Sequence, residues 1–265
     1  MNISIKPSAD INLIKIKLLA VILFMVIGCK ALSQQKEAFT IHSHNDYTRP
    51  QAFYMAFNAG AEAIEADIYL RRGRLMVAHD TADIKATRTL TGMYLEPLLK
   101  EMRTRPRPLN LLIDFKESYA TLLPQLIREL EPLLPLLKNE KNKAPLTIVI
   151  TGNRPPPAEY KNYPSYIMFD DDLQRAHTAE EWKRVAQVSL NFENYSGWKG
   201  EGALPQHDEK LLHAVINAVH RSGKKIRFWA APDNSSGWQT LMALNADILN
   251  TDKIVELRAL LNSRR

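Results

Sequence analysis

The sequence predicts an α/β protein, specifically a single-domain (β/α)8 barrel of the TIM type. Three observations predict this fold. Eight strand-like segments recur across residues 39–265, and helical patterns follow most of them. One segment, Leu109–Phe115, is almost continuously apolar, as expected for a strand buried on both faces. The number and spacing of the units are typical of a (β/α)8 barrel, although a doubly wound open sheet shows a similar alternation.

The first units lie between residues 39 and 78. A strand is predicted at Phe39–His44, and a helical pattern follows at Gln51–Ala59 and ends at Gly60. The second strand is predicted at Ala63–Leu70, where the tip Arg72-Gly73 turns the chain into a further extended segment, Leu75–Ala78.

The remaining units follow the third strand, Leu109–Phe115. An amphipathic helix is predicted at Ser118–Leu137, and its three prolines should break or kink it. Five more strands are predicted at Leu146–Thr151, Tyr166–Phe169, Val185–Phe192, Lys225–Ala230 and Asp247–Asn250. Helices are predicted at Ala179–Arg184, Glu209–Arg221, Gly237–Leu244 and Lys253–Asn262.

The composition excludes several classes of protein. With 265 residues, 45% of them hydrophobic, the chain is long and apolar enough for a sizeable core, so disorder is excluded as its main state. A single Cys cannot form a disulfide scaffold. The net charge of +6 comes without a dense run of basic residues, so nucleic acid is not an expected partner.

The N-terminal segment is predicted to be a lipoprotein-type signal peptide, residues 1–28. Its apolar run Leu18–Ile27 follows two lysines and is too short to span a bilayer core of roughly 30 Å. The run ends in Val26–Cys29, which resembles a bacterial lipobox, so Cys29 is expected to carry lipid and residues 29–38 to form a tether. We therefore expect an exported, membrane-anchored protein of the cell envelope. An ordinary signal peptide and an uncut anchor are the alternatives.

Ionisable residues are concentrated where the predicted strands end, which is the position of the active site in this fold. Glu65 and Asp67 stand two positions apart on one strand, so their carboxylates point the same way. Adjacent carboxylates repel unless they are protonated or share a cation, and a hard divalent ion is the common solution. Asp114 and Lys116 end the next strand on one face. Histidines end the neighbouring segments: His42, His44 and His79.

Each feature alone has an ordinary explanation: a strand edge for Glu65–Asp67, a turn for His79-Asp80, a salt bridge for Asp114–Lys116 and a helix cap for His44–Asp46. One metal site explains all four together, so we predict that site. Elsewhere, Asp170–Asp172 is expected to be a solvated turn and helix cap, with a second cation site as the alternative. Four more histidines are expected on the surface: His177, His207, His213 and His220.

The order of these residues resembles a known superfamily. It is that of the glycerophosphodiester phosphodiesterase-like enzymes, whose barrel is shared by phosphatidylinositol-specific phospholipase C and the spider-venom sphingomyelinase D toxins. The matching motifs are His44, Glu65-x-Asp67, His79-Asp80 and Asp114-x-Lys116. The variant Ser43–Tyr47 with Arg49-Pro50 is most similar to the family named for altered inheritance of mitochondria. Phe228-Trp229 and Asn250–Asp252 resemble the last two strand motifs of the superfamily.

The resemblance implies a metal-dependent phosphoric diester hydrolase that acts on a glycerophosphodiester or a phospholipid head group. Attack by a hydroxyl of the substrate, giving a cyclic phosphate, is an equal alternative. One divalent cation, Mg²⁺ or Ca²⁺, would be bound by Glu65, Asp67 and Asp114. The implied catalytic residues are His44, His79 and Lys116, with the histidines as base or nucleophile and as acid. The implied substrate contacts are Asn45, Trp229 and Asn250.

Two positions differ from the usual pattern of the superfamily. Asn45 stands where an Arg is typical and cannot supply a guanidinium to the phosphate, and Asp114 stands where Glu is typical. These differences leave the identity of the diester open. Two other classes compete with this hypothesis. His42-x-His44 is similar to the metal pair of amidohydrolases and of polymerase-and-histidinol-phosphatase domains, and a non-catalytic surface lipoprotein is the other alternative.

Overall fold

The computed structural model describes residues 39–139 and 141–264. The predicted signal peptide, the tether and Cys29 lie outside the described residues, so the lipid anchor and the export of the chain remain predictions. Within the described part of the chain, no helix has the length and apolar character needed to cross a bilayer.

The described residues form a closed barrel of parallel strands. In chain order the strands are β1 (Thr40–Ser43), β2 (Ala63–Arg71), β4 (Leu109–Phe115), β5 (Leu146–Gly152), β6 (Ile167–Asp171), β7 (Val185–Asn191), β8 (Ile226–Trp229) and β9 (Ile248–Thr251). Each strand pairs with its neighbours in that order, and β1 pairs in parallel with both β2 and β9. The predicted (β/α)8 fold is confirmed, and the closure excludes the open sheet.

The predicted segment after Arg72-Gly73 is also confirmed. It is β3 (Arg74–Val77), an antiparallel strand that pairs with the end of β2 and lies outside the parallel barrel. Arg72 and Gly73 both have positive φ, at 52° and 74°, which is the backbone conformation of a tight hairpin turn. The hairpin carries the chain back to His79.

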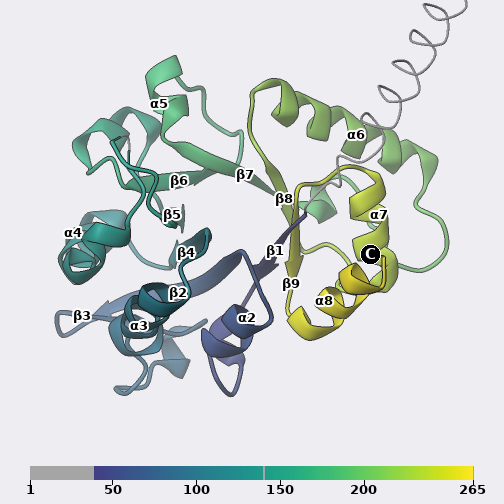
Figure 1. Ribbon diagram of the computed structural model, residues 1–265. Helices are drawn as coiled ribbons and strands as arrows, with labels where there is room; N and C mark the ends of the chain where they lie inside the picture. The colour runs from purple at the N-terminus through teal and green to yellow at the C-terminus, as the bar shows by residue number, and fades with distance from the viewer. Residues whose placement is uncertain (1–38, 140, 265) are drawn as a thin grey trace, which may run out of the picture. The chain divides into compact units, whose positions relative to one another are not determined.

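Helices surround the strands, as Figure 1 shows. They are α2 (Tyr54–Asn58), α3 (Glu96–Thr104), α4 (Tyr119–Glu129), α5 (Ala179–Lys183), α6 (Gln206–Arg221), α7 (Ser235–Ala243) and α8 (Ile254–Ser263). Short 3₁₀ helices occur at Asp46–Thr48, Thr81–Asp83, Glu131–Leu136, Pro157–Asn162 and Phe192–Asn194, and a π turn occurs at Thr91–Leu95. In α6 the buried residues Leu212, Ile216 and Val219 recur at helical spacing, which directs one face toward the core.

Three helical regions differ from the prediction. α2 is shorter than expected because Phe53 has a positive φ of 64° and cannot be part of the helix. α4 contains Pro124 but ends at Glu129, and the chain continues as a 3₁₀ helix through Pro132 and Pro135. α3 lies between β3 and β4, where no helix is predicted from the sequence.

β6 also differs from the prediction, because it runs on to Asp171. Asp170 and Asp171 are each only 2% exposed, so the prediction that these two residues form a solvated turn is wrong. The predicted surface position of His177 is wrong as well. Its side chain is 5% exposed, and its Nε2 lies 3.0 Å from Oδ2 of Asp171. Burial of the carboxylate requires such a partner.

Candidate active site

A cavity of about 360 Å³ opens at the carboxyl ends of the first barrel strands. Its lining includes eight of the nine residues for which a catalytic, metal-binding or substrate-binding role is predicted: His44, Asn45, Glu65, Asp67, His79, Asp114, Lys116 and Trp229. Thr151, Gly152 and Arg227 complete the lining. The strand-end position of these residues thus brings them to one cavity, as the barrel topology requires.

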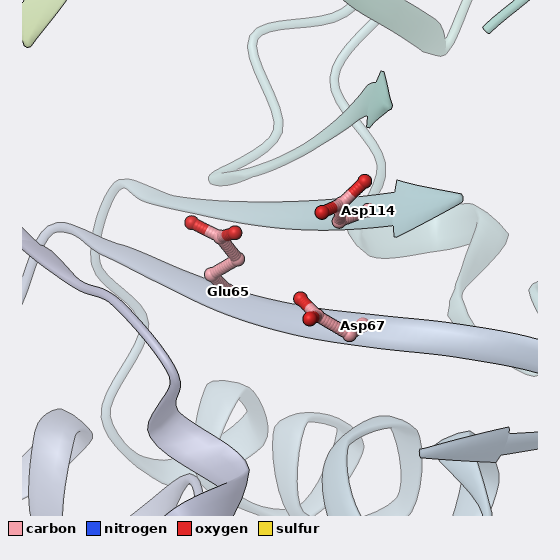
Figure 2. Close-up of side chains that lie close together, drawn as sticks. All are labelled: Glu65, Asp67 and Asp114. Atoms are coloured by element: carbon pink, nitrogen blue, oxygen red, sulfur yellow. The ribbon is translucent and has the colours of Figure 1, made fainter. Parts of the chain in front are cut away.

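Three carboxylates gather at the base of this cavity. Glu65 and Asp67 lie on β2, and Asp114 on the neighbouring β4 is in register with Asp67. Figure 2 shows the three side chains on one side of the two strands, with their carboxylates close together. One oxygen from each lies within 4.8 Å of the others. Glu65 and Asp67 are buried, at 4% and 1% exposed.

This group fits a divalent cation. Oxygens bound to a common Mg²⁺ or Ca²⁺ at about 2.0–2.6 Å can be no more than about 4–5 Å apart, and the three carboxylates meet that limit. Oδ1 of Asp67 is buried and, among the described residues, has no hydrogen-bond partner. Such a carboxylate oxygen is costly unless a cation or a proton satisfies it. The acids therefore form a group that could hold one metal ion.

Lys116 supplies a positive charge to two of the acids. Its Nζ lies 2.8 Å from Oδ2 of Asp67 and 2.7 Å from Oδ2 of Asp114. Burial alone would lower the pKa of Lys116, but the two carboxylates outweigh it and raise the pKa above its usual range. Lys116 is therefore a fixed cation at the edge of the acidic group, about a quarter exposed to the cavity.

Arg227 on β8 holds the third acid and is not among the site residues that the sequence predicts. It is 4% exposed, and its Nη1 donates to Oε2 of Glu65 at 2.8 Å. Burial would raise the pKa of Glu65, but Arg227 and His42 hold that pKa well below its usual range. The signal in the sequence is the apolar strand Ile226–Phe228 interrupted by an arginine, which requires a buried acidic partner.

His42 lies in the barrel interior and does not line the cavity. Its Nε2 is 2.6 Å from Oε2 of Glu65 and 2.7 Å from Nη1 of Arg227. Complete burial, assisted by Arg227, lowers the pKa of His42 to about 4. In the described chain, the acids Glu65, Asp67 and Asp114 form a candidate metal group that contains no histidine. This arrangement does not resemble a metal centre built on His42-x-His44.

His44 follows β1 and lies in the wall of the cavity. Its Nδ1 is 3.0 Å from Oδ1 of Asp252 and 2.9 Å from Nδ2 of Asn45. Burial would lower the pKa of His44, but Asp252 and the charge of Glu65 together raise it above the ordinary value. A carboxylate can only accept, so the bond to Asp252 places the proton on Nδ1 and leaves Nε2 free.

His79 lies beside Asp67, and its side chain is 59% exposed. Its Nδ1 is 3.2 Å from Oδ2 of Asp67 and 3.2 Å from the hydroxyl of Tyr47. Tyr47 is buried, and its hydroxyl can donate to Asp67 at 2.8 Å or to Oδ1 of Asn45 at 2.7 Å. Tyr47 therefore links the acidic group to the loop after β1. Its place in the Ser43–Tyr47 motif is the signal that the sequence offers for it.

Of the last two predicted substrate contacts, Trp229 lines the cavity and Asn250 does not. Trp229 ends β8 and is 42% exposed at the rim of the cavity. Asn250 on β9 does not line the cavity, and its Oδ1 accepts from Nη1 of Arg227 at 3.3 Å. In the structure Asn250 contacts the side chain that holds Glu65, so its effect on the site passes through Arg227.

Comparisons with known proteins find a related domain, related sequences and the same fold. Residues 30–107 match the AIM6-like phosphodiesterase domain. The altered inheritance of mitochondria protein 6 homolog of Arthroderma benhamiae is 26% identical over 255 residues, covering 81% of this chain and 81% of that protein. The corresponding protein of Eremothecium gossypii is 26% identical over 272 residues, covering 81% and 67%. The predicted resemblance is confirmed.

Solved structures resemble the barrel as a whole. A glycerophosphodiester phosphodiesterase from Parabacteroides distasonis has a TM-score of 0.57 at 12% identity, covering 87% of this chain and 99% of that one. A glycerophosphodiester phosphodiesterase from Agrobacterium tumefaciens has a TM-score of 0.51 at 15% identity, covering 85% and 100%. At these identities the likeness concerns the fold, while the domain match includes the positions of His44, Glu65, Asp67 and His79.

Proposed function

We propose that this protein is a metal-dependent phosphodiesterase that cleaves a glycerophosphodiester or a phospholipid head group. The observation that carries the proposal is the grouping of three carboxylates, one lysine and two histidines around one cavity. An acidic group that binds a divalent ion, flanked by two proton-transfer groups, is suited to displacement at phosphorus. The match to a phosphodiesterase domain supports the same reaction class.

The acids Glu65, Asp67 and Asp114 would hold one divalent cation, Mg²⁺ or Ca²⁺. When bound, such an ion polarises a phosphoryl oxygen and offsets the negative charge that develops there. Lys116 contributes to the same task from the protein side, because its ammonium is fixed beside Asp67 and Asp114. Gly152 leaves the space that Asp114 occupies, since a Cβ there would lie 2.0 Å from its Oδ1.

His44 and His79 would move the protons. In each, Nδ1 faces a carboxylate, of Asp252 or of Asp67, and this contact leaves Nε2 free for the substrate. One imidazole would accept a proton from the attacking oxygen, and the other would donate a proton to the oxygen that leaves. An attacking hydroxyl within the substrate would use the same base and give a cyclic phosphate.

Phosphorus NMR of purified protein with a panel of glycerophosphodiesters and lysophospholipids tests this proposal. We expect product with Mg²⁺ or Ca²⁺ and none with excess chelator, and the chemical shift separates cyclic from open products. His44→Ala and His79→Ala should each reduce turnover by at least 100-fold. The matched control is His213→Ala, because His213 lies half exposed on α6, away from the cavity. Turnover close to wild type in either of the first two variants would contradict the assigned proton transfer.

A further inference from the structure

A second cavity, which we call the arginine cavity, lies beside the loop that follows β1. It has a volume of about 390 Å³ and shares no lining residue with the acidic cavity. Its lining comes from two segments, the one that leads from β1 into α2 and the one that leads from β3 into α3. At about 30 Å³ for each water molecule, the arginine cavity has room for about 13 waters or for a small organic ion of similar size.

The lining of the arginine cavity is basic. It contains two arginines, Arg49 and Arg88, and none of its described residues is an acid. In the described part of the chain, Arg88 forms no ion pair with a carboxylate. Its Nη2 donates to the carbonyl oxygen of Tyr47, and its Cζ lies 6.0 Å from the centre of the Tyr47 ring. A guanidinium charge that no carboxylate offsets attracts an anion.

Arg49 has a nitrogen without a partner. Its Nη1 donates to the carbonyl oxygen of Asp252 at 2.9 Å, and its Nε lies 3.4 Å from Oδ1 of Asp46 and 3.4 Å from Oγ of Ser43. Asp46 therefore offsets part of the charge of Arg49. The Nη2 atom is buried and, among the described residues, has no hydrogen-bond partner. A buried donor without an acceptor is costly, so an anion that reaches this nitrogen relieves that cost.

The other walls of the arginine cavity limit the kind of anion that fits. Pro50, Met93 and Pro97 form what we call the apolar wall, and Tyr54 carries a hydroxyl that can donate. Guanidinium groups bind phosphates through paired N–H donors. Two cationic groups attract a dianion more strongly than a monoanion. A phosphate monoester is largely a dianion at neutral pH, whereas a phosphate diester carries a single charge.

We propose that the arginine cavity binds a phosphate monoester and that the bound phosphate acts on the loop that carries His44. The phosphate would lie against Arg49 and Arg88, and the organic group would cover the apolar wall. Binding of the monoester is independent of the proposed function. Its meaning rests on that function, because hydrolysis of a diester by water releases an alcohol and a phosphate monoester. The cavity would then bind the product of the reaction and select against the substrate.

Both arginines contact residues that reach into the acidic cavity. Arg49 donates to the carbonyl oxygen of Asp252, whose carboxylate lies 3.0 Å from Nδ1 of His44. Arg88 donates to the carbonyl oxygen of Tyr47, whose hydroxyl contacts the acidic group. A ligand that moves either guanidinium therefore changes the surroundings of the candidate catalytic groups.

Calorimetric titration of the full chain with phenyl phosphate tests the binding. The titration contains excess chelator, because without a metal the three carboxylates of the acidic cavity repel an anion. We expect one bound phenyl phosphate per chain. Methyl phenyl phosphate, the matched diester, should bind at least fivefold more weakly. Inorganic phosphate should bind at least threefold more weakly, because it leaves the apolar wall uncovered. Binding of the diester or of inorganic phosphate as tight as that of phenyl phosphate would overturn the monoester as the ligand.

Two substitutions locate the bound phosphate. Arg88→Gln should weaken the binding of phenyl phosphate at least tenfold, and Arg221→Gln at the exposed end of α6 is the control that should leave it unchanged. Pro50→Glu keeps both arginines and places a carboxylate at an exposed position of the lining, so it should also weaken binding at least tenfold. Its neutral match, Pro50→Gln, should weaken binding less than threefold. Unchanged binding in folded Arg88→Gln and Pro50→Glu would overturn the site.

NMR of the same titration tests the action on the loop. We expect the imidazole resonances of His44 to shift as phenyl phosphate saturates the chain, and to stay in place in Arg88→Gln. Unshifted resonances in a saturated wild-type chain would overturn that part of the proposal. A chain that binds phenyl phosphate in this way but cleaves no diester would refute the proposed function and support the arginine cavity. A chain that cleaves diesters but binds no phenyl phosphate would do the reverse.

Discussion

Asp114 and Gly152 show how a single position shapes the acidic cavity. They lie on neighbouring strands, and Gly152 has a φ of +69°. A Cβ at this position would lie 2.0 Å from Oδ1 of Asp114 and 2.7 Å from the carbonyl oxygen of Phe115. Contacts this short with backbone cannot be relieved by a rotamer change, so any side chain at position 152 must displace Asp114 or the end of β4.

Gly152→Ala is therefore predicted to reduce the proposed phosphodiesterase activity at least 100-fold by displacing Asp114. The matched control is Gly202→Ala, because Gly202 has a similar φ of +64° but a Cβ added there would meet no atom within 4 Å. Both variants bear the cost of an alanine at positive φ, about 1 kcal/mol, and only one clashes. Equal kcat/KM values in the two variants would show that the clash is harmless.

Asp252 is predicted to set the protonation of His44. Because its carboxylate is one of the groups that raise the pKa of His44, Asp252→Asn should lower that pKa. The imidazole resonances of His44, followed by NMR from pH 5 to 9, measure the shift directly. His220 and its partner Asp247, with 2.9 Å between them, serve as a reference pair that the substitution leaves unchanged. A pKa of His44 that stays the same or rises would contradict this role.

The sequence predicts those site residues whose partners lie on the same strand or at the end of a neighbouring strand. Glu65 and Asp67 share a strand, and Asp114 ends the next one, so the barrel rule brings them together. Arg227 is not predicted in this way because its partner Glu65 is 162 positions away in the sequence. The pair forms because the barrel closes, which leaves only β1 and β9 between β2 and β8.

The loop after β1 shows how an element is held in place by one buried side chain. Asp46 is fully buried, and its carboxylate accepts from the backbone N–H of Phe53 at 2.5 Å, from Ser43 at 3.0 Å and from Tyr94 at 3.1 Å. Burial raises the pKa of Asp46, while these donors act against that rise. The loop that carries His44, Asn45 and Tyr47 is thereby tied to α2 and to the π turn.

Asp46→Ala is predicted to lower the free energy of unfolding by about 3–5 kcal/mol, because it leaves several buried donors without an acceptor. Urea denaturation followed by circular dichroism measures the change. The control is Asp83→Ala in the exposed 3₁₀ helix Thr81–Asp83, where we expect a change below about 1 kcal/mol. Similar losses in the two variants would mean that Asp46 does not hold the loop.

Strands are predicted more accurately than helices in this chain, for a physical reason. A strand such as β4 is buried on both faces, so its apolar run is visible in the sequence. The start of α2 depends on the hydrogen bond from the backbone N–H of Phe53 to the carboxylate of Asp46. β6 extends to Asp171 because His177 and Arg154 lie close enough to offset the charge of that residue. Those contacts are long-range or depend on loop geometry, so local patterns do not reveal them.

The barrel interior as a whole contains buried groups with opposite responses to pH. His42 has a pKa lowered to about 4 by burial and by Arg227, so the folded chain binds fewer protons than the unfolded chain between about pH 6.5 and 4. Its contribution to stability is therefore lost as the pH falls through that range. Burial raises the pKa of Asp170 to about 6, against the effects of Arg227 and Ser189, so its contribution increases as the pH falls from about 6 to 4.

These opposite signs predict opposite effects of two substitutions. The free energy of unfolding should fall more between pH 6.5 and 4.5 in Asp170→Asn than in wild type. In His42→Gln it should fall less than in wild type. Each change should be of the order of 2–3 kcal/mol, since one pKa unit corresponds to about 1.4 kcal/mol. Urea denaturation at the two pH values gives the comparison. Changes of the same sign in both variants would contradict the assignment of these charges.

The barrel topology is the part of the whole molecule that the sequence predicts best, because eight alternating units leave few other arrangements. The polar interior is not predictable in the same way. His42, Asp170 and Arg227 lie on three strands that are far apart in sequence. In the sequence, each of them is only a polar residue within an apolar segment. Only the closed barrel pairs them.

A titration with Mn²⁺ tests the acidic group most directly. Electron paramagnetic resonance counts the bound Mn²⁺ ions, and Mg²⁺ and Ca²⁺ are added as competitors. We predict one bound ion per chain that either competitor displaces. We also predict its loss in Asp67→Asn and in Asp114→Asn, with both variants still unfolding cooperatively. A wild-type chain that binds no ion, or folded variants that bind it as tightly as wild type, would contradict the claim that these carboxylates form a metal site.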